Sequence, residues 1–373
     1  MSDGIINFNL NDKSAPMIKV IGVGGGGGNA AEYMYKSGIC DVDFFVCNTD
    51  KKSLLKNAIP NKIHLGVELT GGHGAGNDPN VGEKAALESI EEIEKMLKNN
   101  TKMVFITAAM GGGTGTGAAP VVASIAKQLN ILTVGIVAIP ERQEGTKRVK
   151  QAIEGLKRMR DNVDCLIVID NERINELYQN ETLRGGYDKA NEVLNVAAKG
   201  IAEIITLHGY INVDFADVNT VMNNSGVAVI GTGKASGENR AVDSISMALD
   251  SPLLNNRDIQ GAKNILLNIT SGADEIYTNE LMQITDFIIR RAGNNASVIW
   301  GVGTDEKLGD AISVTVIATG FPADIIQIDN NTIEQFLGKI EIDNAELKVG
   351  INFDNLNNLK KIPAFKRRTL MVK

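Results

Sequence analysis

Two glycine-rich segments, each lying between a predicted strand and a predicted helix, constrain this chain most strongly. Residues 18–23 (IKVIGV) lead into five glycines at 24–28, and residues 102–110 (KMVFITAAM) lead into GGGTGTG at 111–117. A helix N-terminus presents unpaired N–H groups and the positive end of its dipole, so such a turn binds anions. Glycine lets a phosphate approach the backbone, and Thr114 and Thr116 add hydroxyl donors. The two turns therefore predict a phosphate site.

A single glycine run is more often a flexible turn, but two runs in one region favour a ligand with several phosphates. Neither run contains GxxxxGK[ST], so an ordinary P-loop is excluded. The first run satisfies GxGxxG, and a dinucleotide fold places a ribose-binding acid about 20 residues later, for which Asp43 and Asp50 are candidates. That fold has no need of the second run, whereas a nucleoside triphosphate has three phosphates to surround.

The order of the predicted elements indicates an α/β fold with a parallel sheet and its ligand at the carboxyl ends of the strands. Helices alternate with strands predicted at residues 18–23, 42–50, 102–110, 132–140 and 163–170. Residues 187–207 carry apolar side chains at helical spacing and predict a long central helix, about 30 Å in length. From residue 227, further strands with helices between them predict a second, smaller α/β domain.

This reading divides the chain into six parts. Residues after 321 are polar and rich in asparagine and acids, which is typical of a linker. The parts are an N-terminal extension (1–17), a nucleotide-binding domain (18–186), the central helix with the loop after it (187–226), a C-terminal α/β domain (227–321), a short linker (322–353) and a C-terminal peptide (354–373).

Composition excludes several classes of protein. The net charge of −7 argues against general nucleic-acid binding. No apolar run approaches the roughly 20 residues that cross a bilayer, and the first residues do not resemble a signal peptide, so we expect a cytoplasmic protein without a transmembrane segment. Cys40, Cys47 and Cys165 make no metal or disulfide pattern and are expected to be reduced core residues. The three histidines are too scattered to predict a metal site.

Five motifs together resemble the tubulin/FtsZ family. GGGTGTG is similar to the tubulin signature loop, IKVIGVGGGGGNA to the first phosphate loop of the bacterial members, and GAGNDPNVG to the loop near the γ-phosphate. INVDFADVNTVM (211–222) resembles the loop that completes catalysis in a neighbouring subunit, and the final IPAF resembles the tail peptide for adaptor proteins. The resemblance implies a GTPase that polymerises head to tail into the filaments of bacterial cell division.

The resemblance also implies which residues bind GTP or GDP. Glu144 and Arg148 would contact the ribose side, and Tyr187 would stack on a guanine whose polar edge is read by amides. Mg²⁺ would be held mainly through the phosphates and water. The full nucleotide-binding set is Gly25, Gly26, Gly27, Gly28, Asn29, Asn48, Asp50, Ala75, Gly76, Gly112, Gly113, Thr114, Gly115, Thr116, Glu144, Arg148, Asn171, Tyr187, Asn191 and Glu192.

The catalytic carboxylates are expected outside the glycine loops, which contain no strong general base. Asp214 and Asp217, three residues apart, can lie on one side of a turn after the long helix. If that turn meets the γ-phosphate of a neighbour, the two carboxylates orient water and help to position Mg²⁺. The resemblance adds Asn212 to this set. The alternative role of Asp214 is to act as the N-cap of a helix that begins at FADVNTVM.

The last residues combine positive charge with an apolar centre. Residues 360–373 contain six basic residues and no acid, although the whole chain is acidic. We expect Ile362, Pro363, Phe365 and Arg367 to bind a partner with an acidic surface. By resemblance this partner is a membrane-tethering division adaptor such as FtsA, which would recruit the chain to the inner face of the membrane at the division site. Direct attraction to anionic lipid is the weaker alternative.

The residues alone are compatible with two other functions. One is a structural or adaptor protein that binds GTP without hydrolysing it, and the other is an NAD-dependent oxidoreductase. The chain also departs from the family pattern, because it has PERQEG (140–145) where PFxFEG is usual and glutamate at 172 and 192 where aspartate is frequent.

Overall fold

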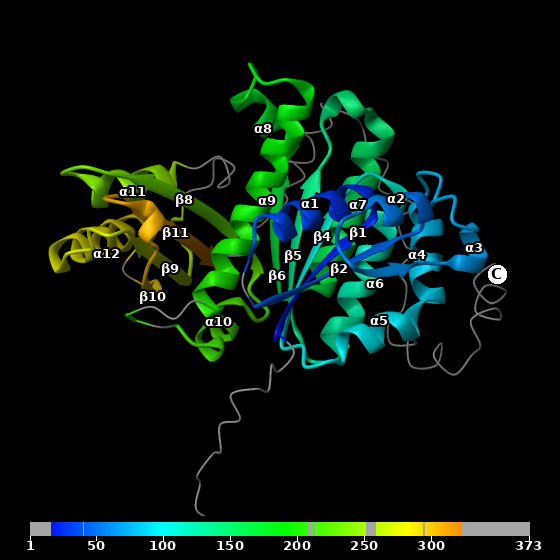
Figure 1. Cartoon of the computed structure of the whole chain (residues 1–373), viewed down its shortest axis with the longest axis horizontal. Coiled ribbons are helices and arrows are strands. Elements are labelled where there is room, and N and C mark those ends of the chain that lie inside the picture. The colour runs from blue at the N-terminus through cyan, green and yellow to red at the C-terminus, as the bar shows by residue number, and fades with distance from the viewer. Residues whose placement is uncertain are drawn as a thin grey trace, which may run out of the picture.

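The structure is a computed structural model that describes residues 16–39, 41–206, 210–211, 213–250, 259–293 and 295–321. Two β-sheets, each covered by helices, lie on either side of a long helix (Figure 1). The linker, the C-terminal peptide, Cys40 and Asn212 lie outside the described residues.

The first sheet is parallel and has the strand order β3-β2-β1-β4-β5-β6-β7. Its central strands are apolar runs buried on both faces, as a parallel sheet between helices requires. The five predicted strands are confirmed, whereas β3 and β7 were not predicted because each is short and has no apolar run. The bounds are β1 Ile18–Val23, β2 Val42–Asn48, β3 Asn61–His64, β4 Met103–Ala109, β5 Leu132–Ile139, β6 Cys165–Asp170 and β7 Gly226–Val227.

Helices cover both faces of this sheet. One apolar cluster joins α1, α8, α9 and α10 to one face, and a second joins α4, α5, α6 and α7 to the other. Because the crossovers are helical, all the strands of this sheet point the same way. The helices are α1 Gly24–Lys36, α2 Lys51–Lys56, α3 Val67–Thr70, α4 Pro79–Glu88, α5 Ile90–Leu97, α6 Gly113–Gln128, α7 Thr146–Asn162, α8 Asn171–Leu177, α9 Leu183–Thr206 and α10 Phe215–Met222, with a short 3-10 turn at Arg142–Glu144.

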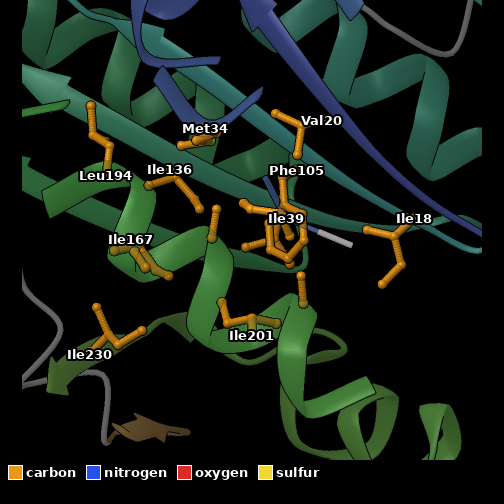
Figure 2. Packing of buried hydrophobic residues seen from close by; sticks show 14 of the residues in the cluster. Ile18, Val20, Met34, Ile39, Phe105, Ile136, Ile167, Leu194, Ile201 and Ile230 are labelled. Atoms are coloured by element: carbon orange, nitrogen blue, oxygen red, sulfur yellow. The ribbon is translucent and has the colours of Figure 1, made fainter. Parts of the chain in front are cut away.

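The long helix α9 is the predicted central helix. It begins four residues before the predicted start and includes Gly185 and Gly186. Its apolar face is buried as the spacing predicted, with Leu194 4%, Ala197 0% and Ile201 0% exposed. Figure 2 shows Leu194 and Ile201 packed against side chains of both sheets, among them Ile136, Ile167 and Ile230.

The second sheet confirms the smaller α/β domain. Its strand order is β10-β9-β11-β8, with β10 parallel to β9 and β11 antiparallel to both of its neighbours. One face packs under α11 and α12, and Ile230, Leu266 and Ile317 on the other face join the cluster around α9. The elements are β8 Val229–Ala235, α11 Arg240–Leu249, β9 Asn264–Ser271, α12 Thr278–Ala292, β10 Ser297–Thr304, a 3-10 turn at Glu306–Leu308 and β11 Ile312–Thr319.

The two cysteines within the described residues agree with the prediction of core thiols. Cys47 and Cys165 are fully buried, and burial raises the pKa of both thiols to about 12. In the described part of the chain, no helix has the length and apolarity that crossing a membrane demands.

Candidate functional site

The two glycine-rich turns meet at the carboxyl ends of β1 and β4. These strands are neighbours in the sheet, so the turns that follow them lie side by side. A Cβ atom on Gly24 would lie 2.8 Å from the nitrogen of Gly115 and 3.3 Å from Cβ of Thr114. Gly24 also has φ +76°, a conformation that favours glycine. The sequence prediction that the two runs form one site is therefore supported by direct contact between them.

The glycines of the first run differ in what surrounds them. A Cβ on Gly26 would lie 2.4 Å from Cβ of Ala109, and one on Gly27 would lie 2.2 Å from the carbonyl oxygen of Thr107. These two glycines let α1 pack closely against β4. By contrast, a Cβ on Gly25 would meet no described atom within 4 Å. Gly25 is the position where the first run faces open space.

The N-termini of α1 and α6 leave their backbone donors available. The N-cap residues are Val23 and Gly112, and neither helix has a side-chain cap hydrogen bond among the described residues. Most helices satisfy some of their first N–H groups with a Ser, Thr, Asp or Asn side chain. A Cβ on Gly112 would likewise meet no described atom within 4 Å. Two uncapped helix N-termini at adjacent turns make a strong anion site.

The two threonines of the second run have different surroundings. The hydroxyl groups of Thr114 and Thr49 lie 2.7 Å apart, which joins the second run to the loop after β2. Thr116 is 1% exposed and its Oγ1 accepts a hydrogen bond of 2.8 Å from the N–H of Gly111. Thr116 therefore holds the shape of the turn from inside. Sequence reasoning missed Thr49, although it lies in the polar stretch CNTD at a strand end.

The loop after β2 uses its acidic residue to begin a helix. The Asp50 carboxylate caps α2 by accepting from the N–H groups of Lys52 and Ser53 at 2.8 and 3.0 Å. The side chain of Asn48 accepts a hydrogen bond from the N–H of Asp50 at 3.2 Å. Asp43, the other candidate for a ribose acid, is the second residue of β2 and lies at the end of the sheet opposite to the turns. Its suggested role in a dinucleotide site was wrong.

The loop before α4 packs onto the second glycine run. A Cβ on Gly113 would lie 2.8 Å from the nitrogen of Asp78 and 2.9 Å from Cβ of Ala75. Asp78 caps α4 by accepting from the N–H of Asn80 at 2.9 Å. Gly76 has φ +59°, and a Cβ there would meet no described atom within 4 Å. Ala75 and Gly76 thus belong to the same edge of the sheet as both turns.

The residues predicted to frame the base come from α8 and α9. Asn171 is the first residue of α8, directly after β6, and its Oδ1 is buried without a hydrogen-bond partner among the described residues. Tyr187 is 56% exposed in the second turn of α9, and Asn191 follows it by one helical turn. Glu192 is paired with Lys189 at 2.8 Å. A buried amide oxygen without a hydrogen-bond partner among the described residues suits a ligand that brings N–H donors.

The acidic residues at the end of β6 begin the next helix. Asp170 caps α8 by accepting from the N–H of Glu172 at 2.9 Å. Burial raises the pKa of Asp170 to about 6, because its effect is larger than that of the backbone hydrogen bonds, which lower the pKa. The sequence DNE after an apolar strand is typical of an N-cap.

The segment that departs from the family pattern forms ion pairs of its own. Arg148 and Glu144, the two residues predicted on the ribose side, are paired with each other on the surface. Nε of Arg142 lies 3.2 Å from Oε2 of Glu172 on α8. This ion pair joins the segment before α7 to α8, and its acid, Glu172, is one of the departures from the family pattern.

Asp214 and Asp217 begin α10 and form a reciprocal cap. The N–H of Asp217 donates to Oδ1 of Asp214 at 2.8 Å, and the N–H of Asp214 donates to Oδ2 of Asp217 at 3.2 Å. The alternative role of Asp214 as an N-cap is confirmed. Both carboxylates lie beyond the end of α9 that is remote from the glycine turns, since α9 spans 24 residues, or about 36 Å. Figure 1 shows α8 and α10 at opposite ends of α9.

Comparisons with known proteins agree with this arrangement. Residues 17–179 match the model of the tubulin/FtsZ family GTPase domain, and residues 226–322 match that of the FtsZ family C-terminal domain. The cell division protein FtsZ of Porphyromonas gingivalis is 48% identical over 87% of this chain and 71% of its own length. The corresponding protein of Pseudomonas putida is 45% identical over 87% of this chain and 82% of its own.

Among solved structures, an empty FtsZ dimer from M. jannaschii superposes with a TM-score of 0.77 at 43% identity. The match covers 83% of this chain and 89% of that one. The second glycine run, which a dinucleotide enzyme does not need, lies within the matched GTPase domain. The chain is therefore a member of the FtsZ branch of the tubulin/FtsZ family of GTPases.

Proposed function

We propose that this chain hydrolyses GTP at contacts between successive copies arranged head to tail, and that the resulting filaments serve cell division. The observation that carries the proposal is the distance between two parts of the site, which we call half-sites: the glycine-rich turns and the carboxylates that begin α10. The phosphate-type turns lie at the carboxyl ends of β1 and β4, whereas Asp214 and Asp217 lie beyond the far end of α9. A carboxylate beyond the far end of a helix about 36 Å long cannot act on a phosphate in the same molecule. A second copy, stacked end on end, brings the two half-sites together.

The phosphates would be held mainly by backbone donors. The open sides of Gly25 and Gly112 give access to the uncapped N-termini of α1 and α6. Thr114 adds a hydroxyl group, and Gly76 adds open backbone from the loop before α4. Gly26, Gly27, Gly28, Asn29, Gly113, Gly115 and Thr116 would support this surface by keeping the turns close together.

The base would lie against α8 and α9. Tyr187 offers an exposed ring for stacking, and Asn191 lies one turn further along the same helix. The unpartnered Oδ1 of Asn171 would accept from the N–H groups on the polar edge of guanine. Glu144 and Arg148 would face the ribose, where their mutual ion pair fixes both side chains.

The chemistry would come from the loop of the adjoining copy. Asp214, Asp217 and Asn212 would orient and polarise the attacking water, with charge building up on the transferred phosphoryl group. Among the described residues, no three His, Cys, Asp or Glu side chains converge as a metal site. By resemblance to the family, Mg²⁺ would be held mainly by the phosphates and water, where it would neutralise charge on the nucleotide.

The test replaces Asp214 in two ways. Asp214→Asn keeps a good N-cap oxygen for α10 but removes the carboxylate, whereas Asp214→Ala removes both and costs about 1 kcal/mol of helix stability. We expect both variants to bind GTP and assemble, with phosphate release reduced at least 100-fold. Unchanged turnover in Asp214→Asn would refute the role of the carboxylate.

Two further measurements separate this proposal from its rivals. A site shared between copies makes phosphate release per subunit rise steeply with protein concentration, and a constant rate would contradict it. A protein that only binds GTP would show no hydrolysis in a single-turnover experiment with excess protein. Copurification with a guanine nucleotide, identified by chromatography, would exclude a nicotinamide cofactor.

The C-terminal peptide would connect filaments to the membrane at the division site. Ile362, Pro363, Phe365 and Arg367 would bind a membrane-tethering adaptor such as FtsA, because the segment combines apolar anchors with positive charge in an acidic chain. Deleting residues 354–373 should leave hydrolysis and filaments intact while abolishing binding to adaptor-coated vesicles. Equal binding by the truncated chain would exclude this docking site, and loss of binding to adaptor-free anionic vesicles would point to lipid instead.

A further inference from the structure

The loop between α9 and α10 is joined to the second domain through the edge strand β10. The N–H groups of Tyr210 and Ile211 donate to the carbonyl oxygen of Val302 at 2.8 and 3.3 Å. The N–H of Val302 donates in return to the carbonyl oxygen of Ile211 at 3.0 Å. Both backbone polar groups of Val302 thus bind the loop, because β10 lies at the edge of the described sheet.

Gly301, the residue before Val302, has no room for a side chain beside this loop. A Cβ on Gly301 would lie 3.1 Å from Cγ2 of Val213 and 3.2 Å from the carbonyl oxygen of Ile211. Carbon atoms in ordinary contact lie at least about 3.5 Å apart, so a methyl group here would displace the loop by about 0.4 Å. Val213 is 4% exposed within the cluster around α9, and its β-branched side chain has little rotamer freedom. The backbone of the loop would have to move instead.

Such a movement reaches the carboxylate directly. Asp214 follows Val213 in the chain and begins α10, where its position is held by the reciprocal cap with Asp217. We propose that Gly301 is a positioning residue for GTP hydrolysis: its missing side chain, together with the pairing of Val302, sets where Asp214 meets the nucleotide of the adjoining copy. The inference rests on the proposed function of Asp214. Gly301 itself would touch neither nucleotide nor water.

The chain offers a matched control on the same strand. Gly303 lies two residues after Gly301, so both positions share one face of β10. A Cβ on Gly303 would meet no described atom within 4 Å. Neither glycine has positive φ, so alanine suits the backbone at both positions. Gly303→Ala therefore makes the same chemical change as Gly301→Ala without pushing the loop.

The experiment measures phosphate release by fully assembled Gly301→Ala, Gly301→Val and Gly303→Ala. Because a displacement of 1 Å can cost about 100-fold, a shift of about 0.4 Å should lower kcat on the order of fivefold in Gly301→Ala. The valine should lower it further, and Gly303→Ala should match the parent chain. GTP affinity of the monomer should be unchanged in all three, since the phosphate turns lie at the other end of α9. Equal kcat in Gly301→Ala and Gly303→Ala would overturn the proposal.

A mixing experiment separates a misplaced loop from a damaged fold. A Gly25→Leu chain has its open phosphate side filled but retains an intact loop, so it should restore turnover of GTP bound to Gly301→Val. Asp214→Asn, which lacks the carboxylate, should restore none. Stimulation of the parent chain at low concentration by Gly25→Leu is the positive control. If that control is positive and the mixture of Gly25→Leu with Gly301→Val shows no increase in phosphate release, the proposal is overturned.

The same set of variants tells the failure of this inference from the failure of the proposed function. Full activity in Asp214→Asn would reject the shared site itself. An inactive Asp214→Asn together with fully active Gly301 variants would reject only the positioning role of Gly301.

Discussion

Within the first glycine run, we predict that Gly25 is needed for GTP binding and that Gly27 is needed for the packing of α1 on β4. Gly25 faces open space, whereas a Cβ on Gly27 would lie 2.2 Å from the carbonyl oxygen of Thr107 and 3.0 Å from Cα of Ala108. Contacts between carbon and oxygen are ordinarily about 3.2 Å, so Gly27→Ala must push α1 away from β4 by about 1 Å. Both contacts are with backbone atoms, which cannot rotate aside.

The expected magnitudes follow from this geometry. Overpacking costs about 1–3 kcal/mol, and the better helix propensity of alanine returns up to about 1 kcal/mol, so Gly27→Ala should lose about 2 kcal/mol of unfolding free energy. Gly25→Ala should be as stable as the parent chain or slightly more stable. It should nevertheless bind GTP about 10- to 100-fold more weakly, because the methyl group obstructs hydrogen bonds to a charged phosphate.

Urea unfolding of the nucleotide-free chains measures the first effect, and calorimetric titration with GTP measures the second. The parent chain is the control for titration, and Gly25→Ala is the control for unfolding. If Gly25→Ala binds GTP with the affinity of the parent chain, the open side of Gly25 is not where phosphate approaches. If Gly27→Ala has the same midpoint of urea unfolding as the parent chain, the close packing of α1 on β4 is not required for stability.

Three further predictions concern single side chains. Burial raises the pKa of Asp170 from 3.8 to about 6, so ionisation of this carboxyl lowers the free energy of unfolding as pH rises through this interval. Asp170→Asn keeps a capping oxygen and should add about 1–2 kcal/mol of unfolding free energy at pH 8 but little below pH 4. Urea unfolding measures this gain, and an equal gain at both pH values would contradict the ionisation of Asp170 as its cause. Arg240 is 3% exposed, and its guanidinium donates to both carboxylate oxygens of Glu280 at 2.8 and 3.0 Å. Arg240→Lys cannot donate to both oxygens in this planar arrangement, so it should lower the free energy of unfolding by about 3 kcal/mol. An unchanged midpoint of thermal unfolding would refute the need for the guanidinium. Tyr187→Ala should weaken GTP binding about tenfold in calorimetry without changing stability, because the ring is 56% exposed; unchanged affinity would exclude stacking.

Much of the fold was predictable because it rests on local patterns. The five buried strands of the first sheet were recognisable as apolar runs, and α9 was recognisable by its helical spacing. The short strands β3 and β7 were missed, because two to four residues at the side of a sheet carry no pattern of their own. Pairing with a neighbour, which is a tertiary event, makes them strands.

The site was predictable in kind and less so in detail. Glycine turns beside strand ends indicated phosphate binding. Asp43 and Asp50 were equal candidates for a ribose-binding acid, and the structure places Asp43 at the end of β2 opposite to the glycine turns. Thr116 was expected as a donor, and its burial against Gly111 shows that it supports the turn. Which hydroxyl faces outward depends on packing around the turn rather than on its residue types.

The amino-acid sequence by itself determined the two glycine-rich turns, the alternation of strands and helices, and the carboxylates that begin α10. Each depends on interactions within a few residues: uncapped N–H groups, backbone conformations open to glycine, or a side chain that caps its own helix. Only the tertiary structure decided that the phosphate turns and Asp214 lie at opposite ends of α9, and that Gly301 lies against Val213 while Gly303 faces open space. The physical reason is that the space around a Cβ atom, and the distance between two sites, are set by residues far away in the chain.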